Sequence, residues 1–260
     1  GRSNEEPGHD PEIRRLRRAP SYQRLRPLAQ RREPPMRRSV DLRRLLNDWP
    51  YDPENNVRVV TGDDGREVLQ VRTLLGLEQY ELEGRPDGQC PHGTDSLFDY
   101  QLGRLEQARS QGREAEFTLK KNECAELFEE GTLFYYRYLH LFQARDWART
   151  VRDTARNLRL FDFVRRYAAR EEDRDHLEKW RPYILRMNSI ASAMLEVDRG
   201  RFDPALQLVE SAVRRIENLE ELDDETFRYE RSRSLQALRE LVDEIHRRRP
   251  VPELERLEHA

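Results

Sequence analysis

Apolar residues return every three or four positions through most of the chain, which is the spacing that places them on one face of a helix. The series starts near Thr118 and continues almost to Pro250, and charged positions separate the apolar ones. Its successive stripes include Cys124, Leu127, Tyr135, Tyr138 and Phe142; Trp147, Val151 and Leu158; Leu177, Trp180, Ile184 and Leu195; Ala205, Leu208, Val209, Ala212 and Ile216; and Leu235, Leu238 and Ile245. The spacing predicts about five consecutive amphipathic helices with short links.

Ahead of these helices the period changes from helical to alternating. Strands are expected at residues 57–61, 67–73 and 78–82, because apolar side chains there alternate with polar ones. The Asp64-Gly65 pair is typical of a tight hairpin turn, since glycine tolerates a positive φ. A short helix is expected just before the strands, with Ser39 as its cap. The dry face of so small a meander needs a helix to pack on.

Further along the chain, local signals mark where helices begin. Thr94 or Asp95 is expected to open a helix that ends at Gly112. Asp203 is expected to cap a later helix, with Pro204 at its first position, where the missing N–H costs nothing.

The predicted fold class is therefore mainly α: an irregular stack of antiparallel amphipathic helices preceded by a small three-stranded antiparallel β-meander. Four segments are expected: an Arg/Pro-rich arm at 1–38, a short helix with the meander at 39–94, a helical, repeat-like domain at 95–250, and the start of a truncated helix at 251–260. We expect the native chain to continue past Ala260, since the last stripe is not completed.

Composition agrees with thin helical layers rather than a large compact enzyme. Hydrophobic residues make up 36% of the chain and charged residues 37%. No stretch approaches the roughly 20 apolar residues that a membrane span requires. The cysteines, Cys90 and Cys124, are too few for a disulfide framework. The chain is expected to be cytoplasmic and to have no membrane partner.

The N-terminal arm is strongly basic, because residues 1–38 hold 11 Arg against 5 Asp or Glu. The arm has no sustained apolar period and is predicted to be disordered. One interpretation is a tether for nucleic acid or for an acidic partner, since flexible arginines neutralise phosphates without needing a fold. The other is that Met36 is the true start and the upstream residues are over-extended reading frame from GC-rich DNA.

The segment "GRFDPALQLVESA" carries the strongest local signature. A turn glycine, an aromatic residue, and small and large apolar residues follow one another at fixed offsets; together with the preceding small residue they are Ala193, Gly200, Phe202, Ala205, Val209 and Ala212. Residues 187–219 resemble one tetratricopeptide helical hairpin, which implies packing roles for these six residues. The frame repeats only faintly around Trp147, with Thr150 and Thr154 at the matching positions. Ordinary helical-hairpin packing is the alternative interpretation.

A second resemblance lies at the C-terminal end. The helix over 228–249 followed by "PELERLEHA" resembles the run-up to the UVR motif of bacterial excision-repair proteins and adaptor proteins, with Leu254, Leu257, Glu258 and Ala260 at its opening positions. The second helix of that motif is absent here. The resemblance implies a bacterial protein-contact module.

Known catalytic and metal-binding patterns are missing from the sequence. There is no nucleophile elbow, no glycine-rich phosphate loop and no His-Glu-x-x-His pair. Cys90 and His92 form the only close Cys/His pair, and no second pair completes a zinc site. We therefore predict no catalytic residue, no metal and no cofactor.

Two groups of side chains are candidates for an interaction surface. Tyr136 and Arg137 lie in the aromatic run "LFYYRYLHLF", where core burial competes with a role in stacking against a partner. Arg152, Arg156 and Arg159 fall on one helix face, either as a positive stripe or as a solvated face paired with nearby acids. The leading prediction is a non-catalytic protein-interaction or scaffold protein. The alternative is a nucleic-acid-associated accessory factor that uses the arm and the arginine stripe.

Overall fold

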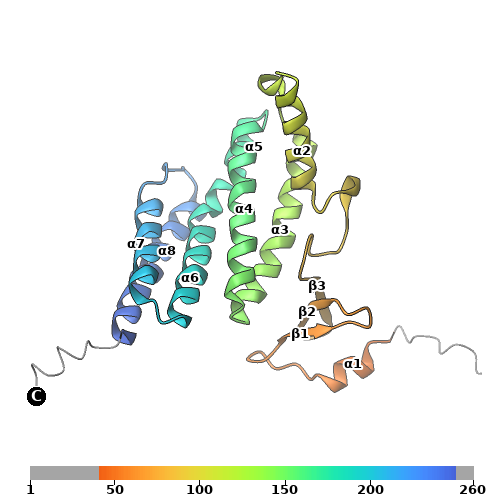
Figure 1. Ribbon diagram of the computed structural model, residues 1–260, viewed down its shortest axis with the longest axis vertical. Helices are drawn as coiled ribbons and strands as arrows, with labels where there is room; N and C mark the ends of the chain where they lie inside the picture. The colour runs from red at the N-terminus through yellow and green to blue at the C-terminus, as the bar shows by residue number, and fades with distance from the viewer. Residues whose placement is uncertain (1–40, 250–260) are drawn as a thin grey trace, which may run out of the picture. The chain divides into compact units, whose positions relative to one another are not determined.

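The computed structural model describes residues 41–249, which are mainly helical and contain a three-stranded antiparallel sheet ahead of the long helices (Figure 1). The predicted fold class is thereby confirmed. The sheet and the helices belong to one compact unit. The predicted arm at 1–38, the expected cap Ser39 and the expected helix at 251–260 lie outside the described residues.

A short helix and the meander form the start of the described chain. Helix α1 (Arg43–Asp48) ends just before Pro50, as proline lacks the N–H that a continuing helix needs. The strands β1 (Val57–Thr61), β2 (Glu67–Arg72) and β3 (Leu77–Glu81) pair in the order β1-β2-β3. Gly65 has a φ of +81°, so the expected hairpin turn is confirmed.

One face of the sheet is buried, and its partner is helix α3 (Lys121–Gln143). Leu69, Val71, Tyr80 and Leu82 form a cluster with Leu141 from the C-terminal part of that helix. The expectation that the dry face packs on a helix is confirmed.

The alternation of wet and dry positions is less regular than the sequence indicates. Val57 and Val59 alternate with Arg58, and Leu69 and Val71 alternate with Gln70 and Arg72, which predicts a buried Val59 and an exposed Arg72. In the structure Val59 is exposed on edge strand β1 and Arg72 is buried. The Arg72 guanidinium donates from Nε to the Trp49 carbonyl (2.9 Å) and from Nη1 to the Gly76 carbonyl (3.1 Å). Burial is tolerated because backbone oxygens of the neighbouring turns accept its protons.

Helix α2 (Leu97–Ser110) follows the meander and begins one or two residues later than expected. Ser96 caps it, since its hydroxyl accepts from the amide of Asp99 at 3.1 Å. The Thr94 hydroxyl is unavailable for that role because it donates to the Pro91 carbonyl at 2.7 Å. Gly112, with a φ of +69°, follows the end of the helix as expected.

The remaining helices form two hairpins and a final long helix (Figure 1). α3 pairs with α4 (Trp147–Tyr167), and α6 (Arg181–Asp198) pairs with α7 (Phe202–Glu217). The short α5 (Glu171–His176) connects the hairpins, and α8 (Glu225–Arg248) follows them, capped by Asp224. α4 also packs against α6, while α8 packs against both α6 and α7.

Two expected helix starts need correction. The stripe from Leu177 to Leu195 is not one helix, because the 3-10 turn η4 (Glu178–Trp180) separates α5 from α6. Pro182 lies in the first turn of α6 and would clash with a helical turn upstream of it. Helix α7 begins at Phe202, so Asp203 lies inside its first turn and is not the cap.

The two hairpin turns have the same backbone form. Arg145 in the α3–α4 turn and Gly200 in the α6–α7 turn both adopt a left-handed conformation, with φ of +58° and +71°. In each turn this residue and the next donate their amides to carbonyls of the last helical turn. Counted from these turns, Thr150 and Thr154 occupy the places of Ala205 and Val209, and all four side chains are fully buried.

Both threonines are accommodated by bonds within their own helix. The hydroxyl of Thr150 donates to the Asp146 carbonyl (2.8 Å), and that of Thr154 donates to the Thr150 carbonyl (2.6 Å). A hydroxyl satisfied in this way can take a position that an apolar residue fills in the other hairpin. The faint repeat of the frame around Trp147 is therefore a repeat of turn geometry and burial.

The shared turn gives a prediction about stability. Arg145→Gly should raise the free energy of unfolding by about 1 kcal/mol, because glycine carries no Cβ penalty at positive φ. Gly200→Ala should lower it by about 1 kcal/mol for the same reason. Urea unfolding followed by circular dichroism measures both changes, and two shifts of the same sign would contradict the explanation.

The helices share two clusters of buried side chains. One joins α2, α3, α4 and the start of α6; the other joins α6, α7 and α8. Ala193, Ala205, Val209 and Ala212 lie in the second cluster and Phe202 packs against it. Five of the six residues of the repeat signature are thus packing residues, whereas Gly200 is exposed in the turn between α6 and α7.

His140 lies where α3 meets the sheet, with its ring centroid 5.7 Å from that of Tyr80. Its Nδ1 atom is buried without a hydrogen-bond partner, and burial lowers the pKa of the imidazole below its usual value of 6.5, although Glu78 nearby opposes this shift. The folded state therefore favours neutral His140. Its contribution to stability is fully present above the unfolded pKa and is lost as the pH falls through the folded pKa.

We therefore expect the free energy of unfolding to decrease as the pH falls from about 7 to about 5.5. His140→Phe keeps a ring beside Tyr80 and removes the titrating group, so the slope against pH should become shallower. His176, whose pKa burial also lowers, remains in this variant and accounts for a residual slope. Equal slopes for the wild type and the variant would show that His140 does not contribute.

Candidate functional site

The predicted arginine surface is not present as expected. Arg137 and Arg156 are buried, with exposed fractions of 1% and 8%. Arg152 is partly exposed and paired, whereas Arg159 and Tyr136 are exposed. Of the two interpretations of Arg152, Arg156 and Arg159, the free positive stripe is wrong. Arg152 pairs with Glu83 and Asp153, as the alternative of a face paired with acids expects, and Arg156 is buried against Glu130.

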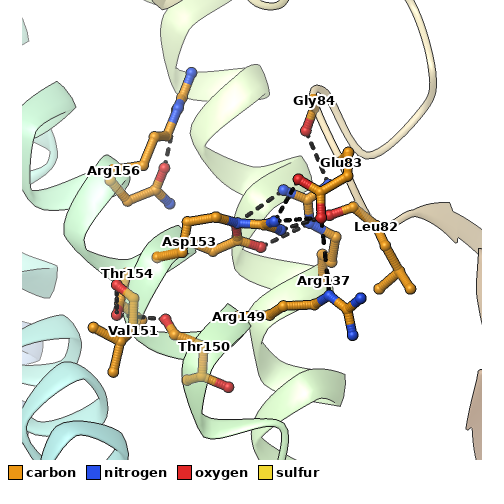
Figure 2. Close-up of polar contacts among 12 residues, drawn as sticks. Leu82, Glu83, Gly84, Arg137, Arg149, Thr150, Val151, Asp153, Thr154 and Arg156 are labelled. Atoms are coloured by element: carbon orange, nitrogen blue, oxygen red, sulfur yellow. Dashed lines mark hydrogen bonds and ion pairs between the residues drawn. The ribbon is translucent and has the colours of Figure 1, made fainter.

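Arg137 connects three segments of the chain (Figure 2). Its Nε and Nη2 donate to the two carboxylate oxygens of Asp153 on α4, at 2.7 and 2.9 Å. Its Nη1 donates to the backbone carbonyls of Glu81 (2.7 Å) and Gly84 (2.9 Å) at the end of β3. The planar guanidinium suits this arrangement because its donors point along fixed directions. Arg137 therefore fastens the meander to the α3–α4 hairpin.

Arg152 also links α4 to the loop after β3. It donates to Glu83 and to Asp153, so Asp153 accepts hydrogen bonds from two arginines. Arg149 on the preceding turn donates to Glu67 of β2 at 3.1 Å. These contacts attach one face of α4 to the sheet and the loop after it.

Glu130 is the second buried ionic centre. Its carboxylate is fully buried on α3 and pairs with Arg156 of α4 and, at 3.1 Å, with Arg85. It also accepts hydrogen bonds from the first two backbone amides of α2, those of Leu97 (2.7 Å) and Phe98 (3.0 Å). A negative charge at a helix N-terminus satisfies free N–H groups and complements the helix dipole. Both ionic centres are fully partnered, so they hold the fold together and leave no position for a ligand.

A cavity of about 430 Å³ lies on the other side of α3, among α3, α4, the end of α5, η4, α6 and α8. Its walls are largely aromatic, with Phe128, Tyr135, Tyr136, Tyr138, Phe161, Trp180 and Tyr183. Tyr136 and Trp180 remain 47% and 42% exposed, whereas the other rings are at least partly buried. Tyr136 is the only predicted interaction residue that lines this cavity.

Most polar groups of the cavity are uncharged. Burial raises the pKa of Tyr138 well above its usual value and also raises that of Tyr183, and it lowers the pKa of His176. These three side chains are therefore neutral at neutral pH. The charged side chains on the wall are Glu230 and Arg233, both from α8.

Glu230 is the most unusual of these groups. Its side chain is only 9% exposed, and its Oε2 atom has no hydrogen-bond partner. The nearest cation is Arg186 on α6, whose Nη2 lies 3.5 Å away without forming a hydrogen bond. The Nη1 atom of Arg186 and the hydroxyl of Ser234 are also buried without partners. Buried polar groups in folded proteins nearly always find a partner, so this cluster requires an explanation.

The sequence gives no local signal for most of this site. Glu230 lies in a charge-mixed run, and Trp180 belongs to a short turn between helices. Only the aromatic run on α3 indicates a candidate binding surface in addition to core packing.

Several kinds of site are absent from the described part of the chain. Between residues 41 and 249, no three His, Cys, Asp or Glu side chains converge in a way that could hold a metal ion. Within the same range, no helix combines the length and apolar character that crossing a membrane requires. Comparison with known proteins adds no relationship: no family model, no curated protein and no solved structure matches this chain.

Proposed function

We propose that this chain is a non-catalytic protein-binding module of the scaffold or adaptor kind, and that the aromatic cavity receives a segment of the partner. The observation that carries the proposal is the pair of exposed rings, Tyr136 and Trp180, at a cavity whose deeper walls are also aromatic. Tyrosine and tryptophan are enriched among the residues that dominate protein–protein binding energy. A cavity of this kind accepts an anchoring side chain.

The arrangement of the helices supports the same function. α3 and α6 are the first helices of two hairpins with the same turn, and both line the cavity together with α8. The resemblance of residues 187–219 to a tetratricopeptide hairpin agrees with a role in binding proteins. We further propose a cytoplasmic location, which is supported by the two free cysteines, Cys90 and Cys124.

The test is a pull-down from a native lysate with the full chain as bait. Tyr136→Ala combined with Trp180→Ala removes both exposed rings of the cavity and should abolish the capture of the specific partner. The matched control is Tyr51→Ala combined with Leu208→Ala, two exposed apolar residues that do not line the cavity. The proposal fails if every captured protein is retained equally by both double variants.

The second candidate function is that of a nucleic-acid-associated accessory factor. Its support is the basic composition of residues 1–38 and the resemblance of the C-terminal end to the UVR motif. Nucleic-acid binding of this origin should weaken steeply with salt and disappear when residues 1–38 are deleted. Binding that survives the deletion would exclude the arm as its source.

A further inference from the structure

The buried carboxylate of Glu230 indicates what kind of group the cavity binds. A carboxylate oxygen that is removed from water and accepts no hydrogen bond is energetically costly. Arg186 balances part of its charge, but at 3.5 Å without a hydrogen bond it does not satisfy the oxygen. Glu230 also lines the cavity, so a ligand that carries N–H donors can approach its carboxylate from that side.

The walls restrict the ligand further. The face of an aromatic ring carries partial negative charge and attracts a cation placed over it. Tyr136 and Trp180 offer exposed rings of this kind in the cavity that contains Glu230. A guanidinium group fits these walls better than an ammonium group does, because it is planar, stacks on aromatic faces and donates two parallel hydrogen bonds to a carboxylate.

Charges around the cavity act in both directions. The guanidinium carbon of Arg186 lies 5.0 Å from the centre of the Tyr183 ring. Arg233 is exposed on α8, and its guanidinium carbon lies 6.0 Å from the centre of the Tyr229 ring. Arg233 can turn toward solvent when a second cation enters. On α3, Glu129 is exposed one turn before Thr132 of the wall, and it enters none of the ion pairs found within residues 41–249.

We propose that the cavity binds an arginine side chain of a partner protein, with Glu230 as the acceptor of its guanidinium and the exposed rings of Tyr136 and Trp180 against its plane. This inference rests on the proposed protein-binding function and specifies the chemistry of the partner segment.

The experiment compares three capped pentapeptides that share alanine flanks and carry arginine, citrulline or glutamate at the centre. Citrulline has nearly the shape of arginine but no charge, so it isolates the contribution of the cation. Binding to the full chain is followed by isothermal titration calorimetry and by chemical-shift changes of the Trp180 indole. The arginine peptide should bind at least about tenfold more tightly than the citrulline peptide. The glutamate peptide should show no saturable binding.

Glu230→Gln should bring the affinity for the arginine peptide down to that for the citrulline peptide. The control is Glu240→Gln, which removes the same charge from the same helix about 15 Å further along. This control should change the affinity less than about twofold. Should Glu230→Gln fail to fold, as judged by near-ultraviolet circular dichroism, Tyr136→Ala changes only an exposed ring and should weaken arginine binding about threefold to tenfold.

The results separate this inference from the function on which it rests. Equal affinities for arginine and citrulline, or tighter binding of the glutamate peptide through Arg233 and Arg186, would overturn the arginine assignment. In that case a pull-down that still depends on Tyr136 and Trp180 would leave the protein-binding function standing. If neither peptide binding depends on Glu230 nor partner capture depends on Tyr136 and Trp180, both the arginine assignment and the protein-binding function are refuted.

Discussion

Arg137→Met should lower the free energy of unfolding by about 3–5 kcal/mol, because it leaves the carboxylate of Asp153 buried without its main counter-charge. The substitution also frees the carbonyls of Glu81 and Gly84, which are held by Nη1 of the same side chain. The loss should be visible as a large decrease in the urea midpoint. In native-state hydrogen exchange, the amides of β3 should become the least protected of the sheet.

Two companion variants test the cause. Arg137→Lys keeps a positive charge but not the planar fork, so it should recover only part of the lost stability. Arg137→Met combined with Asp153→Leu removes the stranded carboxylate and should be more stable than Arg137→Met alone. If the double variant is instead less stable than the single one, Asp153 has a separate role and the explanation is wrong.

Glu130→Gln should cost about 3 kcal/mol, the second largest effect that we expect. The carboxylate pairs with Arg156 and Arg85 and accepts the first amides of α2, and the neutral amide cannot satisfy all of these donors. The effect specific to this site should be faster hydrogen exchange at the amides of Leu97 and Phe98, whereas the exchange rates of the α8 amides should not change. Glu126→Gln, an exposed substitution one turn earlier on α3, provides the control and should change stability by less than about 0.5 kcal/mol.

The helices and strands could be predicted because their signals are local. The alternation between residues 57 and 82 and the Asp64-Gly65 turn indicated the meander to within a residue or two. The break before α6 was missed because the stripe through Leu177 and Trp180 stays helical in spacing while the backbone forms a 3-10 turn. The exposure of Val59 and the burial of Arg72 depend on what covers each strand, and spacing along one strand carries no such information.

The candidate site was less predictable than the fold. The helical spacing of Arg152, Arg156 and Arg159 was recognised, but the carboxylates that bind Arg137 and Arg156 come from neighbouring helices. A charged residue in an amphipathic helix normally faces solvent, so only the tertiary structure shows these pairs. Tyr136 was identified from the aromatic run on α3. Glu230 and Trp180 come from segments about 100 and 45 residues further along the chain, which no local motif connects.

The attachment of the meander also bears on the order in which the chain can fold during synthesis. Residues 57–98 leave the ribosome before the side chains that hold them, because those side chains belong to α3 and α4. The chain loses the entropy of closing these long loops before the stabilising contacts can form. The meander therefore cannot complete its contacts until α3 and α4 have been synthesised, and until then the sheet lacks the helix that covers its apolar face.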